Sequence, residues 1–465
     1  MMKQVLGLVT MLCTAGLMIS PAFATSTSGT DNNETLAQHL APKTPTKNLF
    51  NSDVPYIPSV SISPYIGVPS HFDGSDLIVN NPSINENVKL LQLRQAERAY
   101  LKSKGVELAE TPHLIFSGEI ESQLSYANPY NGSDSSDIDL TDAELDMFLG
   151  LSHWFSGYMT FVYDNAPVNS ATPYDVDNSN IYLDQGFVTV GDFDISPWYM
   201  TVGQFYMPFG RYSSFMVTSP LTKSLGRIKA RAIEAGYQAS ASDFTPHAQV
   251  FAFRGDANPS DDADNIKVFG GDVGFAFDHG SLTSSLGFSA VSEIAESQGI
   301  QGDGDSTSST FDGLSQYSSY ENLDHRVPGV DVYGSVGCGS WSLLGEYTAA
   351  ARSFDSSDVS YNGSGAQPMA ADIEAAYAFH FTHPSSIAIS YQHSWEALAF
   401  NLPEQRIAAT YTVSVWRHTL LSLEVDHDIG YSSGDSASGP AGAAIDTSQL
   451  GNSFNSVILQ LDAYF

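Results

Sequence analysis

The chain has 465 residues and a formal net charge of −33, with 38 glycines, 12% aromatic residues and only 2 cysteines. This acidity excludes a nucleic-acid partner, because binding to phosphates needs a basic surface. Only Cys338 lies outside the first residues of the chain, so an internal disulfide and a zinc cluster of cysteines and histidines are not expected. Beyond those first residues, no apolar stretch is long enough for a membrane-spanning helix.

Residues 1–24 have the pattern of a secretory signal peptide. Lys3 supplies the positive charge, Val5–Ile19 form the apolar region, and Ala22–Ala24 form a cleavage site of the A-x-A type. We therefore expect an exported protein whose mature chain starts near Thr25.

Residues 25–110 are predicted to form an N-terminal periplasmic segment with one helix, at about 84–104. Ser83 and Glu86 have the spacing of a capping box, and Gly105 is a natural helix stop. Leucines in this helix recur at a spacing of three to four residues. The pattern fits a helix that packs under a larger domain, and it also fits a short coiled coil that oligomerises.

From about Leu114 onward the apolar period becomes two. Leu145 and Met147 alternate with Glu144 and Asp146, so one face of the segment is apolar and the other is acidic. A strand with lipid on one side and a wet lumen on the other has this pattern. Sixteen such segments follow one another, at about 113–126, 140–152, 157–164, 180–191, 197–206, 230–240, 247–255, 266–277, 281–292, 327–337, 341–352, 369–380, 386–399, 405–416, 419–431 and 454–465.

The links between these segments alternate in length. Links after even-numbered segments are short, and links after odd-numbered segments are mostly long, at 127–139, 165–179, 207–229, 293–326, 353–368 and 432–453. A soluble sandwich has no reason to separate its loops in this way, whereas a membrane barrel has short periplasmic turns and long outer loops. The sequence therefore predicts an all-β fold, a transmembrane antiparallel β-barrel of sixteen strands over residues 111–465, with both chain ends in the periplasm.

The last segment strengthens this prediction. Val457, Leu459, Leu461 and Ala463 alternate with polar residues before the aromatic Phe465. This pattern resembles the recognition signal for outer-membrane barrel assembly. We therefore expect a multi-pass protein of the Gram-negative cell outer membrane, in contact with outer-membrane lipid and with the barrel-assembly machinery.

Nothing in the sequence indicates an enzyme, a cofactor or a metal site. The histidines are scattered, and several lie in predicted short turns. Carboxylate pairs such as Glu119 with Glu121 and Asp142 with Glu144 have the composition of an acid and base pair. Because they occupy alternate strand positions, they fit the lining of a hydrated lumen better. No catalytic residue is proposed.

Basic residues are rare in the barrel, and four of them lie close together. Lys223, Arg227, Lys229 and Arg231 follow the fifth strand, and Arg211 lies at the outer end of that strand. Porins commonly fold this loop into the lumen as a constriction, and basic rings select anions. We predict that these five residues bind an anionic solute. The alternative is that the loop pairs with acidic strands of the wall.

Three stretches resemble a known family, the LbtU-type siderophore porins. Residues 55–95, PYIPSVSISPYIGVPSHFDGSDLIVNNPSINENVKLLQLRQ, resemble its N-terminal signature. Residues 203–231, GQFYMPFGRYSSFMVTSPLTKSLGRIKAR, and the final VILQLDAYF are similar to the same family. The resemblance implies a sixteen-stranded receptor that carries an iron–siderophore complex, a ferric siderophore, without a globular plug domain or dependence on TonB.

Three hypotheses follow. The first is a porin-like receptor for siderophore uptake and iron transport, with ferrous iron as another conceivable cargo. The second is a general or anion-selective diffusion porin, which needs only a lumen and a constriction. The third is a structural or adhesive barrel whose long acidic loops face a host or a phage. Both a monomer and a homo-oligomer fit the sequence.

Overall fold

A computed structural model describes most of the barrel and part of the N-terminal segment. The signal peptide prediction lies outside the described residues. These are residues 60–62, 79–80, 83–103, 105, 113–164, 180–239, 243–257, 265–302, 310–316, 323–416 and 418–465.

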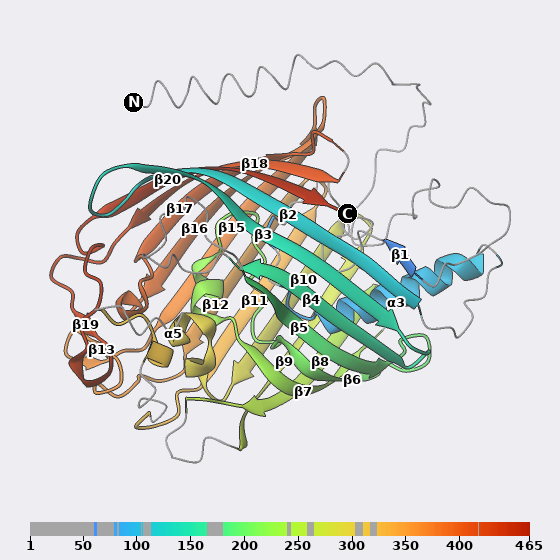
Figure 1. Ribbon diagram of the computed structural model, residues 1–465, viewed down its shortest axis with the longest axis horizontal. Coiled ribbons are helices and arrows are strands. Elements are labelled where there is room, and N and C mark those ends of the chain that lie inside the picture. Colours follow the sequence, from blue (N-terminus) through green and yellow to red (C-terminus); the bar gives the residue numbers. More distant parts are fainter. Residues whose placement is uncertain are drawn as a thin grey trace. The chain divides into compact units, whose positions relative to one another are not determined.

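Sixteen antiparallel strands form one closed barrel, as predicted (Figure 1). Each strand pairs with its neighbours in the chain, and the barrel closes because β2 pairs with both β3 and β20. The strands are β2 (His113–Asn128), β3 (Ser135–Gly150), β4 (Phe155–Asp164), β5 (Asn180–Gly191), β6 (Trp198–Tyr206), β7 (Lys229–Gln238), β8 (Phe244–Arg254), β9 (Ile266–His279), β10 (Leu282–Val291), β11 (Gly329–Cys338), β12 (Trp341–Ala350), β15 (Met369–His380), β16 (Pro384–Trp395), β17 (Gln405–Val413), β18 (Thr419–Ile429) and β20 (Ser453–Tyr464).

Smaller elements accompany the barrel. The predicted helix is α3 (Glu86–Ser103), and none of the described helices is long and apolar enough to cross a membrane. The short strand β1 (Val60–Ile62) pairs in parallel with the start of β2. The other elements are α4 (Leu221–Gly226), η1 (Ile294–Glu296), α5 (Gln298–Gln301), η2 (Leu314–Gln316), β13 (Ser360–Tyr361), β14 (Ser364–Gly365), η3 (Leu398–Phe400), β19 (Ala437–Ser438) and η4 (Pro440–Gly442).

The two faces of the wall differ as the period of two predicts. On β12, Leu343 and Tyr347 are exposed on the outer face, whereas Ser342, Glu346 and Thr348 are buried on the lumen face. Exposed apolar side chains also cover the outer face of the other strands. This surface suits lipid, because each backbone polar group of a closed barrel is paired within the wall.

Four of the five tryptophans lie at the end of the barrel that carries the short turns, and all four are exposed. Trp198 and Trp341 are the first residues of β6 and β12, and Trp154 and Trp416 lie in short turns. Such side chains have an apolar ring and a polar N–H group, so they favour the boundary between lipid and water. Their position indicates one membrane interface at this end.

Two boundaries differ from the sequence prediction by more than three residues. The first outer loop is 129–134 rather than 127–139, because Ser135–Leu140 still pair with β2 in spite of their aspartates. Backbone pairing beyond the membrane does not need an apolar face. Strand β16 ends at Trp395 rather than at residue 399, because Glu396 has a positive φ of 52° and η3 follows.

The long outer loops interlock with one another. Strand β13 pairs with β19, and the Phe311 N–H donates to the Ala444 carbonyl at 2.6 Å. Buried side chains from several loops form a common apolar core that includes Phe311, Leu398 and Ile445. The outer end of the barrel is therefore covered by packed loops, in the part of the chain that the structure describes.

Candidate functional site in the barrel lumen

The link between β6 and β7 folds back into the barrel. We call residues 207–228 the lumen loop. Met207, Phe209, Tyr212 and Met216 in this loop are fully buried. Gly210 allows the first bend with a φ of 76°, and its N–H donates to Ser289 of β10 at 2.9 Å. The prediction of a lumen loop after the fifth strand agrees with these contacts.

Three carboxylates of the wall hold the lumen loop by its main chain. We call Glu346 on β12, Glu374 on β15 and Glu424 on β18 the docking carboxylates, and all three are buried. Hydrogen bonds from N–H groups to carboxylates are among the stronger ones in proteins. Glu346 accepts from the N–H groups of Arg211 and Tyr212 at 2.6 Å each, Glu374 from Ser214 Oγ and the Phe215 N–H at 2.6 Å each, and Glu424 from the N–H groups of Val217 at 2.5 Å and Thr218 at 3.1 Å.

Arg211 is part of this anchor. Its guanidinium group donates to Asp272 of β9 at 3.1 Å and lies over the Tyr333 ring at 4.5 Å from the ring centre. Burial acts to lower the pKa of Arg211, but Asp272, Tyr333 and Glu346 more than compensate and raise it. Arg211 is therefore a permanently charged group that is already paired.

Lys223 and Arg227 lie together in and beside α4. The Lys223 ammonium donates to Asn80 Oδ1 at 2.7 Å, and Arg227 Nε donates to Gln298 Oε1 at 2.9 Å. Burial and the charge of Arg227 lower the pKa of Lys223 to about 7. Neither side chain forms an ion pair among the described residues. These two cations are therefore held in the lumen by neutral partners.

The other two predicted residues have different surroundings. Lys229 forms an ion pair with Asp184 at 2.7 Å. Arg231 is exposed and alternates with the buried Ala232 and Glu234, so it shares the outer face of β7 with Ile233. The structure therefore does not bring Arg231 into the lumen, and the predicted cluster of four basic residues is divided between two faces of the wall.

Helix α3 shares the lumen with the loop. Asn87 donates to Thr201 at 2.8 Å and to Glu234 at 3.2 Å, and both partners are on the lumen face of the wall. At its other end, Arg98 donates to both oxygens of Asp192, at 2.8 Å each, in a short turn. The helix thus runs from the interior to the short-turn end of the barrel (Figure 1).

The contacts of α3 also bear on the coiled-coil alternative. Val88 and Leu91 pack against Phe193 and Tyr199 of the barrel. Upstream of α3, the N–H of Asn80 donates to the Ser214 carbonyl of the lumen loop at 3.0 Å. This apolar face of α3 is therefore covered by the barrel itself, and the N-terminal segment and the lumen loop are hydrogen-bonded to each other.

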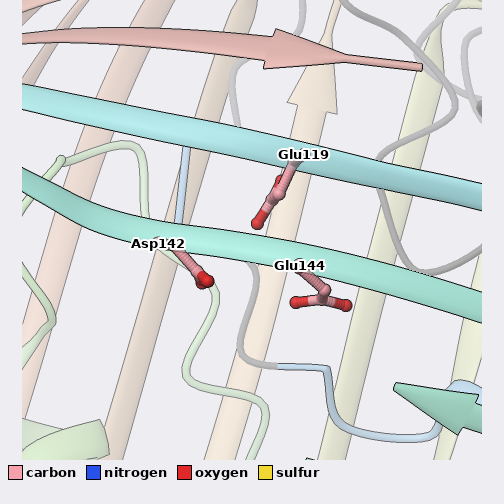
Figure 2. A group of neighbouring side chains, drawn as sticks. All are labelled: Glu119, Asp142 and Glu144. Carbon is pink, nitrogen blue, oxygen red and sulfur yellow. The ribbon is translucent and has the colours of Figure 1, made fainter. Parts of the chain in front are cut away.

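A second group of carboxylates lines the wall near the closure of the barrel. We call it the acidic wall, and it consists of Glu119, Glu121, Asp142, Glu144, Asp146 and Asp462. Three of its side chains, Glu119, Asp142 and Glu144, turn toward a common space (Figure 2). Glu121 and Asp142 act electrostatically on Lys223 of the lumen loop and oppose the fall in its pKa. Basic and acidic groups thus face each other in the lumen.

Sequence reasoning missed the residues that anchor the loop. Arg406 of β17 forms a bidentate ion pair with Asp428, at 2.7 and 2.8 Å, and donates to the Ser219 carbonyl at 3.2 Å. The docking carboxylates were missed as well. Their only sequence signal is an acidic residue at a lumen position of a strand, and the acidic wall has the same signal.

Comparisons with known proteins identify the family. A UPF0422 protein of Coxiella burnetii is 37% identical over 410 residues, which cover 87% of this chain and 84% of that protein. A UPF0422 protein of Legionella pneumophila strain Lens is 36% identical over 425 residues, which cover 89% of this chain and 78% of that protein. The chain belongs to the UPF0422 family. No family model matches the sequence.

Solved structures similar to this UPF0422 protein are outer-membrane channels of low sequence identity. An anion-selective porin from Comamonas acidovorans has a TM-score of 0.47 and 12% identity, over 76% of this chain and 100% of that chain. The outer-membrane channel DcaP of Acinetobacter baumannii has a TM-score of 0.47 and 12% identity, over 77% and 99%. The UPF0422 relatives named above are not described as siderophore porins, so the resemblance to the LbtU type stays a prediction.

Proposed function

We propose that this UPF0422 protein is an outer-membrane channel of the porin type, in which the lumen loop filters small charged solutes. The observation that carries the proposal is the lumen loop itself. It leaves the wall after β6, crosses to β12, β15 and β18, and holds Lys223 and Arg227 opposite the acidic wall. A loop in this position can select which ions pass, because its charged side chains attract or repel ions at short distance in a confined lumen.

Ion selectivity in planar bilayers tests this proposal. The double variant Lys223→Gln with Arg227→Gln removes both lumen cations and is expected to shift the reversal potential toward cation preference. Arg231→Gln is a matched control, since it removes a charge of the same sequence cluster from the outer face. An unchanged reversal potential in the double variant would contradict the filter. A protein that forms no channel under any condition would contradict the porin function.

Uptake of a ferric siderophore is the more specific form of the proposal. One support is the resemblance of residues 55–95 and 203–231 to the LbtU-type siderophore porins. The other is the two neighbouring cations Lys223 and Arg227, which suit an anionic solute. Both α3 and the lumen loop lie in the lumen that such a solute would cross. Uptake by this route therefore includes a movement of α3 or of the lumen loop.

Growth on a ferric siderophore as the sole iron source tests this form. A deletion strain without a redundant receptor is expected to stop growing. The intact gene and the Arg231→Gln variant should restore growth, and the double variant of Lys223 and Arg227 should not. Normal growth of the deletion strain would exclude the siderophore role and leave the channel in place.

A further inference from the structure

The acidic wall contains three carboxylates that the proposed filter does not need. Glu119 of β2 and Asp142 and Glu144 of β3 come from adjacent strands, and the ladder pairs Glu119 with Glu144 and Glu121 with Asp142. One oxygen atom from each of the three lies within 4.8 Å of the other two. Figure 2 shows the three side chains directed to one space between the strands and the lumen.

This spacing fits a single metal ion. Calcium binds oxygen ligands at about 2.3–2.6 Å, so two ligands on opposite sides of the ion are about 5 Å apart and adjacent ligands are closer. All three ligands would be carboxylate oxygens, which hard divalent cations prefer. Zinc is less suited, because its sites are usually built from cysteine and histidine.

The negative charge of this group is not neutralised by the protein. Carboxylates this close together repel one another strongly when all are ionised. Among the described residues, no lysine, arginine or histidine forms an ion pair with any of the three. Lys223 is close enough to act on Asp142 but bonds to Asn80 instead. Protons or a bound cation must therefore supply the missing positive charge.

A fourth carboxylate gives an independent indication of a ligand. Asp462 of β20 is only 3% exposed, and its Oδ1 atom has no hydrogen-bond partner. It pairs with Glu121 across the ladder on the lumen face, and its charge acts on Glu119. A buried carboxylate oxygen without a partner is costly, so such an atom indicates a group that the protein does not itself supply. Asp142 Oδ1 is unpartnered in the same way.

We propose that Glu119, Asp142 and Glu144 bind one divalent cation of the calcium or manganese class on the lumen face of β2 and β3. Asp462 lies beside the site as a further oxygen acceptor for the hydration shell of the ion. The site belongs to the barrel wall, and it does not depend on which solute passes the lumen loop. It would fasten β2 to β3 beside the seam at which β20 closes the barrel.

Manganese binding to the full-length protein tests the site. The protein is refolded in detergent without lipopolysaccharide, and free Mn²⁺ is followed by its electron paramagnetic resonance signal. We expect one Mn²⁺ to bind per chain and Ca²⁺ to compete for it. The double variant Glu119→Gln with Glu144→Gln should weaken binding by more than about tenfold, because ligand charge sets the affinity of such sites.

The matched control is Glu121→Gln on the same face of the same strand. Glu121 already accepts hydrogen bonds from Thr141 and Gln123, so this variant should keep the Mn²⁺ affinity. Heat-modifiable electrophoretic migration verifies that each variant is a folded barrel. Absence of binding in the wild type would mean that protons neutralise the group, and it would overturn the proposal. Binding that persists in the double variant, or that is lost equally in Glu121→Gln, would overturn this choice of ligands.

Discussion

The docking carboxylates and the acidic wall both line the lumen, but their side chains have different neighbours. Glu346 and Glu424 each accept hydrogen bonds from two main-chain N–H groups of the lumen loop, and Glu374 accepts from one N–H group and from Ser214 Oγ. Glu119 and Glu144 of the acidic wall lie against further carboxylates instead. Both groups occupy the same alternating positions of neighbouring strands. The role of a carboxylate in the wall therefore depends on the groups that face it across the lumen. Its position in the strand does not reveal those groups.

The largest effect is expected when the docking carboxylates are removed. The double variant Glu374→Ala with Glu424→Ala leaves the N–H groups of Phe215 and Val217 buried without acceptors. Hydrogen bonds to charged groups contribute about 1.5–3 kcal/mol each, so the free energy of unfolding should fall by several kcal/mol. Urea titration of the heat-modifiable band measures the change. A stability equal to that of the wild type would show that the loop is held by other contacts.

Release of α3 should have the next largest effect, on conductance. Arg98→Ala removes the bidentate contact with Asp192, which fixes the end of α3 to a short turn. The lumen should then be open for a larger fraction of time, and the mean single-channel conductance should rise. Lys89→Ala is a suitable control, because Lys89 is exposed on the same helix and its ion pair with Glu86 is local. Equal conductance in both variants would argue against α3 as an obstruction.

A smaller effect concerns the pH dependence of selectivity. The pKa of Lys223 is lowered to about 7, so this side chain carries its charge below pH 7 and loses it as the pH rises. Anion preference in bilayers should therefore be stronger at pH 6 than at pH 8. The change should disappear in Lys223→Gln. Lys223→Arg should keep the preference of low pH throughout, because arginine stays charged over this range.

The smallest effect is expected at the acidic wall. Asp142→Asn removes one of several like charges and breaks no ion pair among the described residues, so in the absence of divalent cations stability should stay the same or rise slightly. Urea titration with a chelator present measures this change beside that of the docking variants. A loss of stability as large as that of the double variant Glu374→Ala with Glu424→Ala would contradict the difference between the acidic wall and the docking carboxylates.

The barrel was predictable because its signals are local. The period of two places every second side chain on the same face of a strand, and the alternation of loop lengths orders the strands along the chain. The same alternation predicts that Arg231 points away from the lumen, because Ala232 and Glu234 lie on the lumen face of β7. The prediction grouped Arg231 with Lys223 by sequence distance alone, whereas the strand turns successive side chains to opposite sides.

The anchoring of the lumen loop was not predictable in this way. The docking carboxylates lie between 134 and 207 residues away from their donors in sequence. Most donors are main-chain N–H groups, which every residue except proline has, so no residue type in the loop marks the contact. The position of Lys223 and Arg227 opposite the acidic wall was not predictable either. It depends on which strands the lumen loop contacts in the closed barrel.

Docking through the main chain has a consequence for how barrels of this family diversify. Since Glu374 and Glu424 bind Phe215 and Val217 by their N–H groups, most substitutions at these loop positions leave the hydrogen bonds intact. The side chains of the loop can therefore change from one homologue to the next while its path through the barrel is kept. Selection for a new solute could act on the loop without requiring a compensating change in the wall.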